Sequence, residues 1–427
     1  MWDKMQVFCK HIADHQIRLI LNFDKLLNEE ILRNAIAITL KNNPIAFASY
    51  IEGKKDAFWM SSEFDIEKIY SFHKCQASES IVQETILKQL DTLEGPQLTI
   101  SLIRTDSDIL IINCNHPVTD AAGLKEFAYQ LAENYSVLFQ NKTVLQQEYT
   151  PSRSLQLLSV KLSLKERLSI VKTMLSNKKT APSFQKHVGL DLLDNPTFKT
   201  YTIEPYIFEK IKDFGKKYSA SVNDVLLTIY FYTLKKILKN SNKTNRLQYT
   251  SDLRGYLKNV NYDTLSNFSA IHNIDIDNSI DDFTGLLKKI VSITKARKNL
   301  NYDLADFPMM AFLFKLMPYK KIKSLFHKEF NKIKTGKAIA PPSLTNMGII
   351  EESKLAFDKI LPVRANMLGG INHPSLLQLA VSTYMKHLTL SIGSYYCGEN
   401  NFLISNIIKE LKKTIDEEVV QSPVANN

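Results

Sequence analysis

The chain has 427 residues, of which 44% are hydrophobic, 23% are charged and only 13 are glycine, so its composition is that of a packed globular protein. This excludes a disordered chain, a fibrous protein and a small disulfide-stapled scaffold. The four cysteines include no Cys-x-x-Cys pair, which argues against a disulfide framework and a structural zinc site. We therefore expect a reducing compartment, the cytoplasm.

The net charge of +10 is concentrated in two segments. Residues 161–179 hold six Lys or Arg and one Glu, and residues 315–337 hold eight Lys and one Glu. Because the rest of the chain is close to neutral, the whole-surface basic footprint of a nucleic-acid-binding protein is not expected. Each segment is either a solvated helix face or a surface that meets phosphate groups, acidic proteins or a membrane.

Residues 311–337 mix large apolar side chains with lysines, and this pattern has two interpretations. One interpretation is an amphipathic helix whose apolar face covers the core. The other is a peripheral contact with membrane lipid or with an acidic carrier protein. No membrane-spanning segment is predicted, since the longest apolar run, residues 225–234, is half of the roughly 20 residues needed to cross a bilayer.

Apolar alternation and turn signals predict strands and helices interspersed along the chain, which indicates a mixed α/β protein. The predicted strands are residues 16–23, 98–104, 109–114, 248–252, 270–276, 378–385 and 388–395. The predicted helices begin after Asn28 and after Pro117, and cover residues 206–218, a stretch from Val225, and residues 402–417.

The predicted domain boundary lies in residues 150–190, between the N-terminal and C-terminal groups of predicted elements. Residues 150–190 contain two prolines, the first basic segment and few strand signals, which is typical of a helical crossover. We therefore divide the chain into an N-terminal lobe at 1–160, a crossover at 161–190 and a C-terminal lobe at 191–427.

Residues 115–123 (NHPVTDAAG) form the most informative stretch of the sequence. His116 precedes a proline, which favours an extended backbone at the end of the predicted strand, and Asp120 lies where a helix N-cap is expected. Histidine is suited to general-base catalysis near neutral pH. The alternative from spacing alone is that Asp120 only caps the helix and His116 is a hydrogen-bonded turn residue.

Residues 115–121 resemble the HHxxxDG motif of the condensation-domain and chloramphenicol-acetyltransferase-like acyltransferase superfamily, which includes wax ester synthases and alcohol acyltransferases. Further similar segments follow in the order of that family and are spread over most of the chain. They are residues 15–36, 221–234, 251–257, 265–273 and 341–348. The resemblance implies two chloramphenicol-acetyltransferase-like lobes, each a mixed, largely antiparallel sheet with helices, and a channel between them.

The resemblance also implies roles for individual residues. The second histidine of the motif, here His116, is the general base that activates an alcohol or amine acceptor for direct attack on a thioester, without an acyl-enzyme. The motif aspartate, here Asp120, is structural and pairs with an arginine, which Arg254 in SDLR resembles. The donor is acyl-CoA or a carrier-protein thioester, with no metal or redox cofactor.

Substrate contacts are implied for four further positions. They are Asn115, Asn267, Ser343 and Asn346. The motif departs from the family pattern, because Asn115 replaces the first histidine and Ala121 replaces the glycine, although Gly123 follows two positions later. These departures leave a second hypothesis open: a catalytically inactive or altered condensation-like domain that binds a carrier protein or an acyl ligand.

Other residues capable of chemistry give weaker signals. Cys9, His11 and His15 have a metal-like spacing but no accompanying carboxylate or cysteine cluster. Cys114 beside His116 suggests either a thiol nucleophile or a core cysteine at a strand end, and we favour the core cysteine. The isolated His272 and His373 are interpreted as structural.

Overall fold

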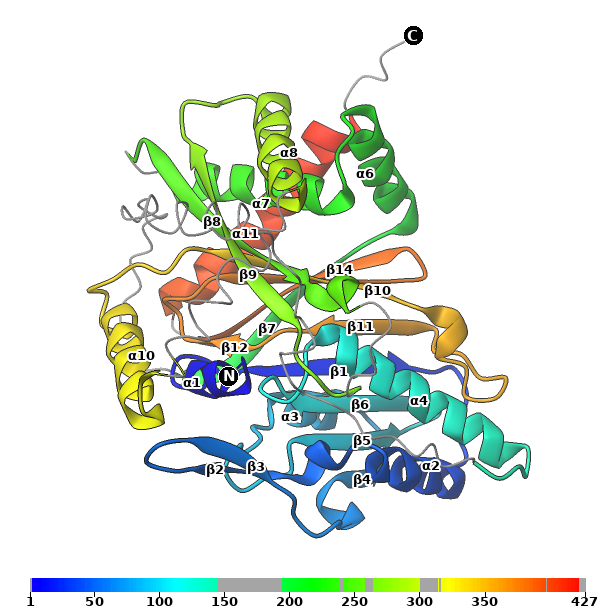
Figure 1. Ribbon diagram of the computed structural model, residues 1–427. Coiled ribbons are helices and arrows are strands. Elements are labelled where there is room, and N and C mark those ends of the chain that lie inside the picture. The colour runs from blue at the N-terminus through cyan, green and yellow to red at the C-terminus, as the bar shows by residue number, and fades with distance from the viewer. Residues whose placement is uncertain are drawn as a thin grey trace.

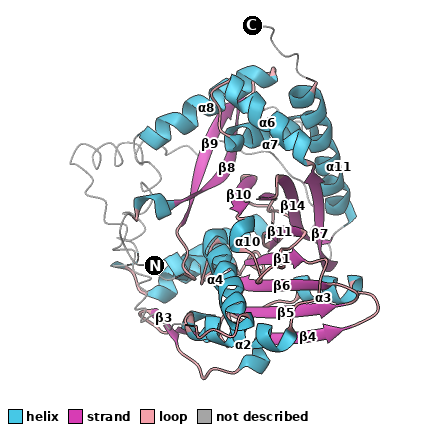
Figure 2. Cartoon of the chain, turned by 90° about the vertical axis from the view of Figure 1, so that its right-hand side faces the viewer, coloured by secondary structure: helices cyan, strands magenta, loops and turns pink. Residues whose placement is uncertain are grey.

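Two β-sheets, each with helices packed against it, form the framework of the molecule (Figures 1 and 2). The computed structural model describes residues 2–144, 194–238, 242–257, 264–299, 314, 316–396 and 398–421. The expected crossover at residues 161–190 and the first basic segment lie outside the described residues. The mixed α/β class predicted from the sequence is confirmed by the interspersed elements of both lobes.

The N-terminal sheet has the strand order β11-β1-β6-β5-β4, with antiparallel pairs except between β4 and β5. Its strands are β1 (Gln16–Asn22), β4 (Tyr70–Lys74), β5 (Leu98–Arg104), β6 (Asp108–Asn115) and β11 (Arg364–Leu368). Helices α2 (Glu29–Lys41) and α4 (Ala121–Phe139) pack together on one face, and α3 (Glu79–Leu87) contacts β5 and β6. The predicted cap of α2 is present, since the Asn28 side chain accepts a hydrogen bond from the Ile31 N–H.

The C-terminal sheet has the order β12-β14-β13-β10-β8-β9, and β7 also pairs with β14. Its strands are β7 (Asp194–Ile203), β8 (Thr244–Asp252), β9 (Ser269–Asp277), β10 (Ser343–Ile350), β12 (Ile371–Asn372), β13 (Gln378–Tyr384) and β14 (His387–Tyr396). The helices of this lobe are α6 (Pro205–Lys217), α7 (Val222–Ile237), α8 (Phe283–Asn299) and α11 (Gly398–Thr414). Helix α7 starts with the predicted capping box, in which Ser221 and Asp224 bond reciprocally.

A third, smaller core lies beside the lobes, where α1 (Trp2–Cys9), the hairpin of β2 (Ser49–Glu52) and β3 (Ala57–Met60), and α10 (Tyr319–Lys334) meet. The aromatic side chains of α10 pack into this core, while Lys320, Lys321 and Lys328 are exposed. Helix α10 therefore contributes apolar side chains to this core, although its Leu325 remains exposed. Among the described residues, no helix has the length and apolar character needed to traverse a bilayer.

Strand β11 links the two lobes. It comes from the C-terminal part of the chain but pairs antiparallel with β1, with Arg18 opposite Leu368. Gly369 and Gly370 then lead directly into β12 of the other sheet. The remaining short elements are 3-10 helices at Pro44–Phe47, Ile66–Lys68, Leu253–Tyr256 and Glu352–Lys354 and a π-helical turn at Ile415–Val420.

Candidate active site between the two lobes

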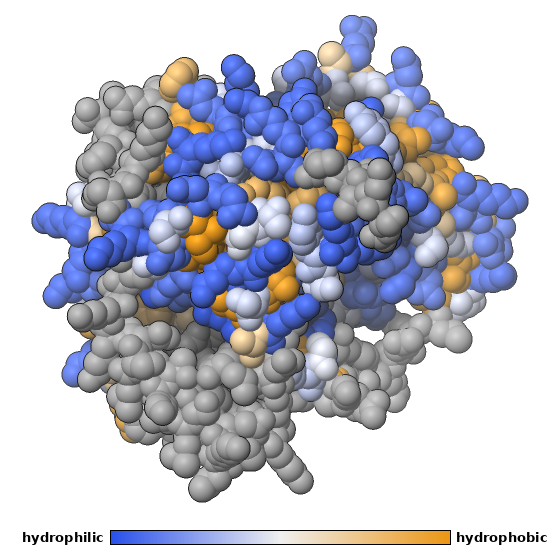
Figure 3. Space-filling model, turned by 90° about the horizontal axis from the view of Figure 1, so that it is seen from above, coloured by the Kyte–Doolittle hydropathy of each residue, from blue (hydrophilic) through white to orange (hydrophobic). Residues whose placement is uncertain are grey.

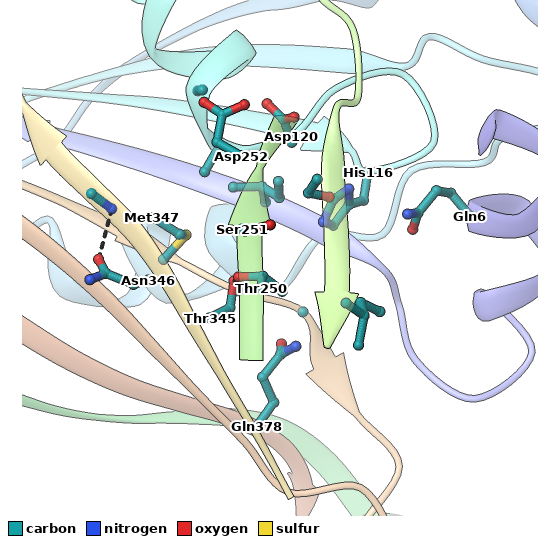
Figure 4. Close-up of a pocket in the computed structure, with 18 of the residues that line it drawn as sticks. Gln6, His116, Asp120, Thr250, Ser251, Asp252, Thr345, Asn346, Met347 and Gln378 are labelled. Atoms are coloured by element: carbon teal, nitrogen blue, oxygen red, sulfur yellow. Dashed lines mark hydrogen bonds between the residues drawn. The ribbon is translucent and has the colours of Figure 1, made fainter. Parts of the chain in front are cut away.

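A cavity of about 250 Å³ lies between the lobes, and residues from both lobes line it (Figure 4). The N-terminal lobe contributes His15, His116 and the start of α4, including Lys125. Strands β8, β9, β10 and β13 contribute polar side chains from the other lobe. These are Thr250, Ser251, Ser269, Thr345, Asn346 and Gln378.

His116 lies on the turn between β6 and α4. Strand β6 ends at Asn115, and the backbone N–H of His116 donates to the carbonyl of His15 at 2.9 Å. The residue is partly exposed and lines the cavity, with Gln6 of α1 facing it in Figure 4. The strand end and the capped helix are as the sequence predicts, and the turn between them presents the imidazole at the lobe interface that the resemblance implies.

Asp120 connects this turn to the opposite lobe. Its Oδ2 atom accepts from Arg254 Nη1 at 2.8 Å and from the Phe268 N–H at 2.7 Å, and its Oδ1 accepts from the Gly123 N–H at 3.0 Å. Burial alone would raise the pKa of Asp120, but the Arg254 charge and these hydrogen bonds outweigh burial and hold the pKa below its usual value. The carboxylate is therefore ionised, caps α4 and fixes the turn.

Gly123 allows the two lobes to approach closely at the start of α4. A Cβ atom at this position would lie 2.6 Å from the Thr264 carbonyl oxygen and 2.3 Å from Thr119 Oγ1. The Asp120 N–H also donates to the Ser266 carbonyl at 3.3 Å in the same region. The glycine requirement of this turn therefore falls on position 123, whereas Ala121 is accommodated in the helix.

Asn267 contacts His116 directly from the other lobe. Its Nδ2 atom donates to the His116 carbonyl at 3.0 Å and lies 2.9 Å from His116 Nδ1. Its Oδ1 atom accepts from the N–H and hydroxyl of Ser269, and these partners assign the orientation of the amide. If Nδ1 accepts from Asn267, the neutral imidazole holds its proton on Nε2.

The electrostatics of His116 favour a neutral ring. Burial lowers its pKa below the usual value. The Asp120 charge and hydrogen bonds with the backbone of His116 and Thr119 act in the opposite direction without cancelling the effect of burial. At neutral pH the ring is therefore unprotonated, so one ring nitrogen holds a proton and the other has a lone pair.

The other predicted substrate-contact positions differ in their placement. Asn346 lines the cavity, where its Oδ1 accepts from the Gly348 N–H at 2.9 Å. Asn115 is fully buried, with its amide bonded to Lys10 Nζ at 2.7 Å and Gln97 Oε1 at 2.9 Å, so the structure does not bring it to the cavity. Ser343, at the start of β10, is also outside the cavity lining.

The sequence reasoning missed Lys125 and several contacts that hold the cavity wall. Lys125 donates to the carbonyls of Met347 and Ile349 at 2.9 and 2.8 Å and thereby connects α4 to β10. His272 bonds through Nε2 to Ser251 Oγ at 2.7 Å, so this buried histidine supports a hydroxyl in the cavity wall. No local spacing signals these contacts, because each joins residues that are far apart or on different strands.

The metal-like spacing near the N-terminus does not form a cluster. His11 stacks on His327 with centroids 4.2 Å apart, whereas His15 stacks on His116 in the cavity. Within the described part of the chain, no group of three or more His, Cys, Asp or Glu is placed to hold a metal ion. Cys114 is fully buried in the N-terminal core.

Comparison with solved structures identifies the fold. The first condensation domain of the CDA synthetase superposes with a TM-score of 0.67 and 11% identity, covering 97% of this chain and 94% of that chain. Polyketide synthase associated protein 5 from Mycobacterium tuberculosis gives 0.67 and 13%, covering 97% of each chain. The trichothecene 15-O-acetyltransferase TRI3 from Fusarium sporotrichioides gives 0.67 and 12%, covering 96% of this chain and 93% of that chain.

Sequence comparisons add no relative, since no protein-family model and no curated protein sequence matches the chain. The structural likeness extends over nearly the whole chain and includes both condensation domains and acetyltransferases. The resemblance stated from the motif is thus confirmed at the level of the fold: the chain has the two-lobed α/β fold of condensation domains and chloramphenicol-acetyltransferase-like acyltransferases.

Proposed function

We propose that the protein is an acyltransferase or condensation-type enzyme that moves an acyl group from a thioester to an alcohol or amine acceptor. The observation that supports this most directly is the imidazole of His116 in the interlobe cavity, on a turn held by the Asp120–Arg254 ion pair. The donor is acyl-CoA or an acyl carrier thioester, and we expect the reaction to take place in the cytoplasm.

In the proposed reaction, His116 Nε2 takes the proton from the acceptor O–H or N–H while the acceptor heteroatom attacks the thioester carbonyl carbon. The tetrahedral intermediate then collapses, the C–S bond breaks, and the proton passes from His116 to the leaving thiolate. No acyl-enzyme forms. Asn346 and the polar residues of β8 and β10 would orient the two substrates, so that proximity supplies much of the rate.

This role requires a specific tautomer of His116. Nε2 accepts a proton only when Nδ1 holds the imidazole proton. The Nδ1–H group would then donate a hydrogen bond to the backbone carbonyls beside the ring. Asn267 would in that case donate only to the His116 carbonyl, so substrate binding would shift the contact between its amide and Nδ1. Asn267 is accordingly a positioning residue in this proposal.

The contact between Asn267 and His116 Nδ1 also supports a second candidate function. If the proton stays on Nε2, the ring is a donor rather than a base, and the cavity then binds an acyl ligand or a carrier protein without turnover. The two functions make opposite predictions for thioester consumption.

Mass spectrometry of products from a panel of acyl-CoAs and carrier thioesters, mixed with alcohols and amines, tests the proposal. His116→Ala should reduce transfer about 10²- to 10⁴-fold, the usual contribution of a general base, with little change in melting temperature. His73→Ala, a half-buried histidine on β4 outside the cavity lining, is the matched control. Wild-type turnover by His116→Ala would refute the proposal, and ligand binding without turnover by the wild type would favour the second function.

A further inference from the structure

A second imidazole lies against His116 in the interlobe cavity. The ring of His15 stacks on that of His116 with centroids 4.7 Å apart and planes 10° from parallel, and both residues line the cavity. We propose that His15 is a positioning residue for His116, whose neutral ring holds the imidazole face-on and stabilises it when it takes a proton. This inference rests on the proposed function.

The backbone of His15 adopts an unusual conformation that surrounding hydrogen bonds hold in place. Its φ is +52°, in the left-handed region that few residues other than glycine adopt. The surrounding contacts impose it: the His15 carbonyl accepts from the His116 N–H, and the Asp14 N–H donates to the Ile371 carbonyl at 2.9 Å. Strained residues fixed by their surroundings in this way are concentrated at functional sites.

A hydrogen bond fixes the outer edge of the His15 ring. His15 Nε2 forms a hydrogen bond with Gln6 Oε1 of α1, and because an amide oxygen only accepts, this amide orientation makes Nε2 the donor. The stack and this bond together restrict the ring to one orientation. Lys10, from the same N-terminal segment, donates to Asn115 Oδ1, so this segment supports both residues of the motif that precede Pro117.

Electrostatics keep His15 neutral while His116 changes its charge. Burial, the adjacent His116 and Lys10 hold the pKa of His15 well below its usual value. The charged and titratable groups around it are Lys10, Asp14 and His116, with Asp120, Lys125 and Asp252 lining the same cavity. Because a cation over an aromatic face is attracted to it, a neutral His15 favours the imidazolium that forms on His116 during transfer.

Two substitutions separate the role of the ring from that of the backbone. His15→Asn removes the ring but tolerates the left-handed conformation, whereas His15→Phe keeps an aromatic face in the less favourable backbone. We expect His15→Asn to lower kcat about tenfold with little change in KM, and His15→Phe to stay within about threefold of the wild type. The melting temperature of His15→Asn should be at least that of His15→Phe.

A titration of the full-length protein with ¹⁵N-labelled histidine provides a readout that needs no turnover. The pKa of His116 should fall in His15→Asn, because the imidazolium loses its stacking partner, and should be nearly unchanged in His15→Phe. An unchanged His116 pKa in both variants would overturn the inference, as would equal kcat values for His15→Asn and the wild type. If the wild type shows no turnover but the His116 pKa still falls in His15→Asn, the proposed function is refuted while the role of His15 beside His116 stands.

Discussion

Removal of the Asp120 carboxylate should destabilise the protein strongly, because it disconnects the turn of His116 from the opposite lobe. The side chains of Asp120 and Arg254 are only 6% and 11% exposed. Asp120→Ala would leave the Arg254 guanidinium and the N–H groups of Gly123 and Phe268 without their shared acceptor. The change therefore combines a broken buried ion pair with the loss of a helix cap.

The expected magnitude follows from these contacts. Breaking a buried pair by removing one partner costs about 3–5 kcal/mol, and loss of an N-cap alone about 1 kcal/mol. Arg254 keeps two contacts, with Asp252 Oδ1 at 3.1 Å and with the Ser266 carbonyl at 2.8 Å. Because these contacts compensate part of the loss, we expect Asp120→Ala to lower the free energy of unfolding by about 3–4 kcal/mol.

Urea unfolding followed by circular dichroism measures this effect, and a double-mutant cycle isolates the ion pair. Asp120→Asn, Arg254→Met and the double variant should show a coupling energy of about 1–3 kcal/mol. Since the pKa of Asp120 is lowered in the folded state, the difference between wild type and Asp120→Asn is fully present above about pH 4 and is lost as the pH falls through the folded-state value. A loss below about 1 kcal/mol for Asp120→Ala, or no coupling, would refute this reasoning.

Three further predictions test the site and the surface. Because burial lowers the pKa of His116, the acid limb of kcat/KM should lie below about pH 6.5, and a limb above pH 7 would contradict its role as base. Gly123→Ala should cost about 1–3 kcal/mol in urea unfolding and reduce transfer, because its Cβ meets the Thr264 carbonyl, whereas Gly255→Ala has open space and should be neutral. The three exposed lysines of α10 should give binding to phosphatidylserine vesicles that is lost at high salt, since the aromatic side chains of this helix pack into the core; salt-resistant sedimentation would contradict this.

The turn of His116 was predictable because each of its signals is local. A proline after the histidine, a capping aspartate and an apolar helical stripe lie within a short stretch, and these features determine the end of β6 and the start of α4. The capping box at Ser221 was predictable for the same reason. Arg254 is 134 residues from Asp120, and only the resemblance to a family suggested that the two residues meet.

Long-range pairing explains what the sequence could not reveal. Strand β11 is five residues long and pairs with a strand more than 340 positions earlier, so no local pattern assigns it to the N-terminal sheet. His15 reaches the cavity through a left-handed backbone between α1 and β1, which helical or strand periodicity does not describe. The weak metal-like signal at 9, 11 and 15 does not correspond to a cluster, because His11 stacks on His327 and His15 stacks on His116.

The buried position of Asn115 could have been predicted from the alternation of side chains along β6. Leu110, Ile112 and Cys114 of β6 belong to the core beneath α2 and α4, so the odd-numbered residues face the other side of the sheet. Asn113 bonds there to the Thr85 carbonyl of α3. Alternation thus directs the Asn115 side chain away from the face where His116 leaves the strand.

This orientation predicts that Asn115→His, which restores the first histidine of the family motif, impairs the protein. The new imidazole would occupy a fully buried position, and the hydrogen bonds of the Asn115 amide with Lys10 and Gln97 would be lost. Burial already lowers the pKa of Lys10 to about 8, so removal of an acceptor from its ammonium makes its charge still less favourable. We expect a loss of about 1–3 kcal/mol from overpacking, with no gain in transfer. Asn115→Ala, which removes the same two amide bonds without adding bulk, is the matched control. If Asn115→His were as stable as the wild type and more active, position 115 would have a direct role in the chemistry that its buried amide does not indicate.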